Sequence, residues 1–221
     1  QTTLAGLAAT QIAALTTTAV KGLTSTQIAG LDLTSLAALA TTQVAALTTS
    51  AIHGLTATQI AALSQTQLGA LAPTEMAALT AGQVEALGTD QLGRLTTTQL
   101  ASLSATGIAG LTATQIASLD DARTAALTTT ELRAMNETQI GSLTTTQIGR
   151  LSTTQVAGLL GTQLAALDAA HFAALTTGQI AAIAGSAVSA LTTTQIASLA
   201  GTALAALTAA EMGALAATQV A

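Results

Sequence analysis

The side chains that could act in catalysis or hold a metal ion are few and scattered. His53 and His171 lie far apart in the sequence and at different repeat positions, whereas a metal site needs ligands that converge. Asp120 and Asp121 form an adjacent acidic pair, which could in principle do general acid–base work. Arg123 follows two residues later and could pair with either carboxylate. We interpret both histidines as repeat variants, and we interpret Asp120 and Asp121 as the N-cap and the first residue of a helix.

Other polar groups give no stronger signal. Glu131, Arg133 and Glu137 form a mildly charged patch, which is typical of a solvated face. Threonine runs at 16–18, 96–98 and 128–130 offer hydroxyl groups, but we see no base placed beside them. A phosphate-binding loop, a catalytic triad and metal-ligand spacing are all missing from the sequence. We therefore predict a protein that is not an enzyme, with no catalytic, cofactor-binding or metal-binding residues and no cofactor.

What the sequence does contain is one unit of eight residues, repeated throughout. Examples are LTSTQIAGL at 23–31, LTATQIAAL at 55–63 and LTTTQIASL at 191–199. We number the octad from its leucine, which recurs from residue 7 to residue 215 and is replaced only by Met135 and Ile183. The 221 residues make about 27 repeats of eight. This period predicts a single continuous repeat array over residues 1–221, without separate domains.

The residue types at each position favour a short helix in each octad. Position 2 is usually Thr, and its substitutes include Asp32, Asn136 and Ser64, which share the ability to cap a helix. Position 5 is usually Gln or Glu, which completes the capping-box pattern. Pro73 stands at position 3, the first helical position, where proline is favoured. Position 6 is apolar except at Thr124, and we expect Phe172 and the methionines to fill the core.

Two other backbones fit less well. In one long helix the leucine would drift by about 80° per octad, so that no face would be apolar. In a strand, positions 1 and 6 would point to opposite faces. Charge placement agrees with short helices, since most acids lie at positions 2–5 and most bases at positions 7 and 8, as the helix dipole favours. We therefore predict an all-α solenoid of very short capped helices, one per octad.

The sequence contains a weaker signal for the number of octads in one layer, which is one turn of the solenoid. Eight octads have neither Gln nor Glu at position 5, and within local clusters they recur every 16 residues. The octads that carry this feature are those of Ala19, Ser35, Ala51, Gly107, Arg123, His171, Ala187 and Ala203. This spacing predicts two octads per layer.

Composition excludes several classes of protein. Phe172 is the only aromatic residue and cysteine is absent, so Ala, Leu, Ile and Val must form the core and disulfides are impossible. The net charge is −5 with only five basic residues, which argues against a nucleic-acid partner.

Polar residues interrupt every octad, so we expect no membrane span. We also expect no signal peptide. Both ends fall within a repeat, so we expect a longer array or ends covered by other chains.

The octad Leu-Thr-x-x-Gln-Ile/Val-Ala-Ala/Gly resembles the repeats of very long, low-complexity bacterial surface and secreted proteins. The resemblance covers the whole chain and implies an extracellular structural or adhesin-like role. LAPTEMAAL at 71–79 is also similar to the start of the repeats of transcription activator-like DNA-binding effectors. That family needs about 34 residues per repeat and many Lys and Arg residues. The octads have neither, so we reject its function.

We therefore predict a structural repeat protein that forms a rod, stalk or filament subunit outside a bacterial cell or on its surface. Its partners would be further copies, associated end to end or laterally. The alternative is a threonine-rich solenoid that binds ice or a polymer. A β-solenoid would present the threonine rows best.

Overall fold

The computed structural model describes residues 7–199 and 201–215, and every regular element in these two ranges is an α-helix. The helices are four to six residues long, and each octad contributes one. The strand alternative is therefore wrong for the described residues, and the predicted all-α solenoid of very short helices is confirmed.

The chain divides into two compact units, Gln1–Leu111 and Thr112–Ala221, and each is described by itself. The helices of unit 1 are α1 (Ala9–Ala13), α2 (Thr17–Lys21), α3 (Ser25–Ala29), α4 (Leu33–Ala37), α5 (Thr41–Val44), α6 (Thr49–Gly54), α7 (Ala57–Ala62), α8 (Gln65–Gly69), α9 (Pro73–Ala77), α10 (Ala81–Glu85), α11 (Thr89–Leu92), α12 (Thr97–Leu100) and α13 (Ala105–Ile108). The helices of unit 2 are α14 (Ala113–Ala117), α15 (Asp121–Ala126), α16 (Thr129–Ala134), α17 (Glu137–Gly141), α18 (Thr145–Arg150), α19 (Thr153–Ala157), α20 (Gly161–Ala165), α21 (Ala169–Ala173), α22 (Thr177–Ile180), α23 (Gly185–Val188), α24 (Thr193–Ser198), α25 (Gly201–Leu204) and α26 (Ala209–Ala214).

Each described helix begins at position 3, and in most octads the side chain at position 2 caps it. Thr24 is extended, with φ −84° and ψ 161°, and its hydroxyl accepts from the Gln27 backbone N–H at 3.3 Å. The Gln27 Oε1 atom accepts in return from the Thr24 N–H at 2.9 Å. Where position 2 is Ala40, the side-chain cap is lost, but the Gln43 carboxamide still accepts from the Ala40 N–H at 2.7 Å. The predicted capping box is confirmed.

The corner between octads consists of two extended residues, the leucine at position 1 and the cap at position 2. Leu55, for example, has φ −63° and ψ 128°, and its N–H donates to the Ile52 carbonyl at 3.1 Å. Thr56 follows with φ −72° and ψ 159°. No described residue has a positive φ, so these corners form without a left-handed residue.

The core of each unit is built from positions 1 and 6. Ile60 and Leu63, for example, are 0% and 4% exposed. A helix this short is marginal alone, so the burial of these two side chains, worth about 1.5–3 kcal/mol each, must stabilise it. Phe172 and Met76 lie in the core as predicted, whereas Met212 is 39% exposed and is not core filler.

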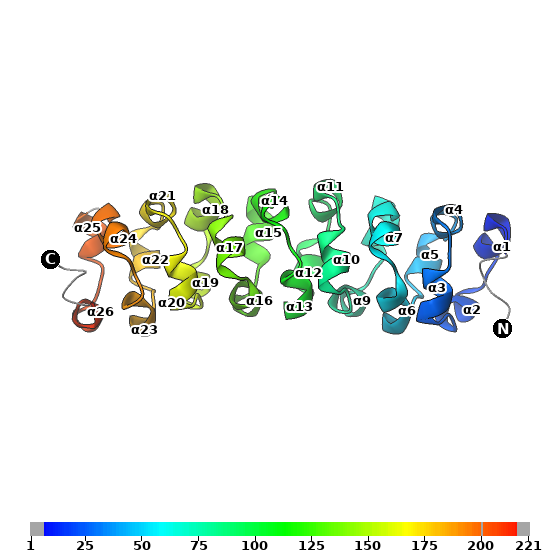
Figure 1. Cartoon of the computed structure of the whole chain (residues 1–221), viewed down its shortest axis with the longest axis horizontal. Coiled ribbons are helices and arrows are strands. Elements are labelled where there is room, and N and C mark those ends of the chain that lie inside the picture. Colours follow the sequence, from blue (N-terminus) through cyan, green and yellow to red (C-terminus); the bar gives the residue numbers. More distant parts are fainter. Residues whose placement is uncertain (1–6, 200, 216–221) are drawn as a thin grey trace. The chain divides into compact units, whose positions relative to one another are not determined.

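Within each unit, a helix packs on the helix three places along the chain. In unit 1, α4 packs on α1 and α7 packs on α4, and Figure 1 shows α1 and α4 as neighbours along one edge. In unit 2, α18 packs on α15 and α21 packs on α18. A turn of the coil therefore takes about three octads, and the prediction of two per layer is corrected. Two columns would require a chain reversal at every corner, for which helices commonly use a left-handed residue that these corners lack.

Two of the octads without Gln at position 5 make close backbone contacts between layers. In α6, Ala51 takes position 5 and Gly54 takes position 8. A Cβ atom on Gly54 would lie 2.3 Å from the Ser25 carbonyl oxygen of α3. Gly107 and Gly110 repeat this arrangement, and a Cβ atom on Gly110 would lie 2.1 Å from the Ala81 carbonyl oxygen.

Candidate functional site

The most regular polar feature is a set of glutamines at position 5 that link successive layers. The Gln59 Oε1 atom accepts from the Thr56 N–H at 2.8 Å. Its Nε2 atom donates to the carbonyls of Ile28 and Leu31 at 2.9 and 2.8 Å, and the side chain is 3% exposed. The Ile28 carbonyl lies at the end of a helix four octads earlier, and the Leu31 carbonyl lies at the corner that follows this helix. We call this repeated arrangement the glutamine ladder; its other members with bonds of this kind are Gln43, Gln67, Gln83, Gln91, Gln99, Gln147, Gln155, Gln163, Gln179 and Gln195.

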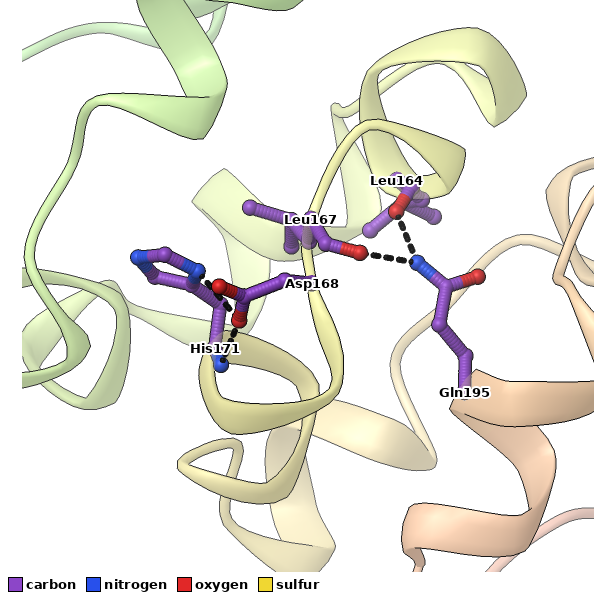
Figure 2. A network of polar contacts seen from close by, with 5 residues as sticks. All are labelled: Leu164, Leu167, Asp168, His171 and Gln195. Carbon is purple, nitrogen blue, oxygen red and sulfur yellow. Dashed lines mark hydrogen bonds and ion pairs between the residues drawn. The ribbon is translucent and has the colours of Figure 1, made fainter.

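Figure 2 shows the ladder beside an octad that departs from it. Gln195 of α24 donates to the carbonyls of Leu164 and Leu167 at 2.7 and 2.6 Å. His171 occupies the same repeat position in α21, but its ring turns back to its own cap, Asp168 (Figure 2). In the octad of α21 the side chain at position 5 therefore contacts its own cap, whereas the Gln195 side chain reaches an earlier layer.

Sequence reasoning identified the glutamines only as capping partners and missed this second bond. A signal for it was present, because a capping box accepts Glu as readily as Gln. Yet Glu takes position 5 only at residues 75, 131 and 211, and Gln is far more frequent. A carboxylate cannot donate a hydrogen bond, whereas the amide accepts at one end and donates at the other.

The predicted capping role of Asp120 is confirmed. Its Oδ1 atom accepts from the Arg123 N–H at 2.8 Å, and its second oxygen pairs with the Arg123 guanidinium. Asp121 instead pairs across layers with Arg150 of α18, at 3.2 Å between Oδ2 and Nε. The two carboxylates are thus held by different cations. The pair between Asp121 and Arg150 is exposed at 59% and 63%, so it contributes about 0–1 kcal/mol to stability.

The predicted solvated patch is correct at Arg133 and Glu137, which are exposed, and wrong at Glu131. Glu131 is 3% exposed because position 5 faces into the coil, as the glutamines do. Its Oε2 atom accepts from the Thr128 N–H at 2.6 Å, while its Oε1 atom is buried without a hydrogen-bond partner. Burial raises the pKa of the Glu131 carboxyl, and the hydrogen bonds from Thr128 offset part of that rise.

The two histidines lie in different units and different settings. The Asp168 carboxylate accepts from the His171 N–H at 2.9 Å and contacts its Nδ1 atom at 2.7 Å. The hydrogen bond from the His171 N–H, above all, lowers the pKa of Asp168. His53 is exposed on α6, in an open hollow lined by Ser25, Thr49 and Ser50. Across residues 7–199 and 201–215, no three His, Asp or Glu side chains are grouped closely enough to hold a metal ion.

Threonine is frequent on the exposed surface of the octads. In α24, Thr193 and Thr194 are exposed at positions 3 and 4, and the capping Thr192 is exposed as well. The same three positions are exposed in the octad of α18. The hydroxyl groups therefore line the first turn of each such helix, beside the corner.

The fold and the ladder define a helical repeat protein with solenoid packing. Residues 124–160 match a family model described as the ALTTAQ repeat, and the segment ALTTTEL at 126–132 lies within the match. No curated protein matches the chain. Among the described helices, none is long and apolar enough to cross a membrane.

Proposed function

We propose that the protein has a structural and not an enzymatic role, as a rod, stalk or filament subunit that associates with further copies end to end or laterally. The glutamine ladder is the observation that carries this proposal. Each ladder octad accepts a hydrogen bond within its own cap and donates to an earlier layer, so the same unit can be added indefinitely. A closed domain needs no such open-ended pattern.

The location outside a bacterial cell or on its surface is part of the same proposal. Its support is the resemblance of the octads to repeats of surface and secreted proteins. The polar residues that could do chemistry support the non-enzymatic role, because Asp120, Asp168 and Glu131 all serve as capping groups.

Small-angle scattering tests the rod. A globule of 221 residues has a radius of gyration of about 17 Å. A single coil with three octads per turn would have about nine turns, each rising by about 8–10 Å, and so a length of about 70–90 Å. The radius of gyration of such a rod is about 21–26 Å or more, taking its length divided by √12. A value at the globular limit would exclude a rod, and an apparent length that never grows with concentration would exclude the filament.

The alternative, a threonine-rich surface that binds ice or a polymer, is favoured by the exposed threonines at positions 2–4. The β-solenoid that would present these rows best is not the observed backbone, because the described residues form helices only. Thermal hysteresis of the purified protein tests ice binding directly, with an array in which the exposed threonines are replaced by serine as the control.

A further inference from the structure

Glu131 places a carboxyl group where the glutamine ladder places an amide. One carboxyl oxygen accepts from the Thr128 N–H at 2.6 Å. The other is buried and has no hydrogen-bond partner, and the side chain is 3% exposed. An acceptor left in this state costs free energy, more so when it is charged.

The neighbouring ladder residue shows what the octad lacks. The Gln163 Nε2 atom of α20 donates to the carbonyls of Leu132 and Met135, both at 2.8 Å, and its Oε1 atom accepts from the Leu160 N–H. An ionised carboxylate can copy only the accepting half of this arrangement. A protonated carboxyl has one O–H group and can supply a donor as well. The ionised form of Glu131 therefore cannot make the donating half of a ladder bond.

The groups around Glu131 provide little compensation for its charge. The helix α19 packs on α16, and its residues Thr153–Ala157 include no titratable side chain. On α16 itself, Arg133 lies in the last turn and is exposed. Arg123, which takes position 5 in α15 as Glu131 does in α16, pairs with Asp120.

The flanking sequence also provides little charge that could compensate an ionised Glu131. Residues 95–119, the octads that precede α15, contain no titratable side chain. Glu137, which begins α17, is exposed. Burial raises the pKa of Glu131 and the bonds from Thr128 oppose that rise, which is the direction expected for a carboxyl without a cation beside it.

We propose that Glu131 makes the α16 layer pH-sensitive, so that the layer is held more tightly when the carboxyl is protonated and more loosely when it is ionised. Because the folded-state pKa of Glu131 is raised, its contribution to stability is fully present below the unfolded value of about 4.3. That contribution is lost as the pH rises through the folded pKa. The capping aspartates Asp32 and Asp168 have lowered pKa values and behave in the opposite way, losing their contribution as the pH falls.

Hydrogen exchange on the full chain tests the proposal, with protection factors corrected for the intrinsic effect of pH. We compare wild type, Glu131→Gln and the matched control Glu137→Gln at pH 4.5, 6 and 7.5. In wild type, amides of residues 128–135 should lose protection several-fold between pH 4.5 and 7.5. Glu131→Gln should be independent of pH and at least as protected as wild type at pH 4.5, whereas Glu137→Gln should follow wild type.

A carboxyl carbon-13 titration of Glu131 provides the second measurement. Its midpoint should lie above the value of about 4.3 of an unperturbed glutamate, because the side chain is buried. A Glu131 midpoint at or below that value would overturn the proposal. So would a Glu131→Gln variant whose protection changes with pH as wild type does, or wild-type protection that stays constant or rises with pH.

Discussion

Replacing Gln83 by alanine tests whether the glutamine ladder holds successive layers together. The Gln83 side chain is 4% exposed, and its Nε2 atom donates to the Ile52 and Leu55 carbonyls, both at 2.7 Å. Its Oε1 atom accepts from the Thr80 N–H at 2.9 Å. The substitution removes all three bonds, but their energetic consequences differ.

The Ile52 carbonyl keeps a second bond, because it also accepts from the Leu55 N–H at 3.1 Å. The Leu55 carbonyl is the acceptor that loses most, and leaving a buried polar group unsatisfied costs about 1–3 kcal/mol. Loss of the capping contact adds about 1 kcal/mol. We therefore expect Gln83→Ala to lower the free energy of unfolding of its layer by about 2–4 kcal/mol.

Because repeat arrays open locally, the assay combines urea unfolding with hydrogen exchange of the backbone amides in α6–α10. Thr98→Ala is the matched control, since Thr98 is exposed and surface substitutions change stability by about 0.5 kcal/mol or less. Gln83→Glu should retain the cap but lose the donor, and so be destabilising at pH 7. If Gln83→Ala proves as mild as Thr98→Ala, the ladder does not hold the layers and the reasoning fails.

Three further predictions test the caps, the register and the close contacts. In urea unfolding at pH 7, Asp168→Ala should destabilise the α21 layer and Asp168→Asn should be nearly neutral, and equal destabilisation by both would contradict the cap. The contribution of the wild-type carboxylate to stability should disappear as the pH falls through its lowered folded pKa. Thr97→Pro, at the first position of α12, should be tolerated, whereas Ile148→Pro should cost about 3 kcal/mol or more beyond the Ile148→Ala control, because the Ile148 N–H donates to the Thr144 carbonyl at 2.9 Å. Gly54→Ala should lower the melting temperature and reduce the free energy of unfolding by about 1–3 kcal/mol, because the new Cβ atom would lie 2.3 Å from the Ser25 backbone. Gly82→Ala, whose Cβ atom would meet nothing within 4 Å, should stabilise α10 by about 0.5–1 kcal/mol. Similar effects at both sites would refute the close contact.

Much of the local structure follows from the order of residues within one octad. The cap at position 2 and the capping partner at position 5 place the start of most helices, because these interactions span only three or four residues. Pro73 at position 3 likewise marks the start of α9. The apolar positions 1 and 6 likewise identify the core, as Ile60 and Leu63 show. All of this could be predicted because each choice depends on atoms close together in the chain.

The arrangement between octads was decided by the tertiary structure. The octads are so similar that the sequence contains no strong signal for whether a helix packs two or three places along, and the spacing of 16 residues pointed to the wrong answer. The corners between octads decide that a helix packs on the helix three places along the chain. This packing brings the Gln59 side-chain amide to the Ile28 carbonyl. It also turns Glu131 into the coil, although its sequence neighbours Arg133 and Glu137 are exposed. The sequence alone thus determines what each octad is, while the stacking of octads decides which polar groups are buried and what they bond to.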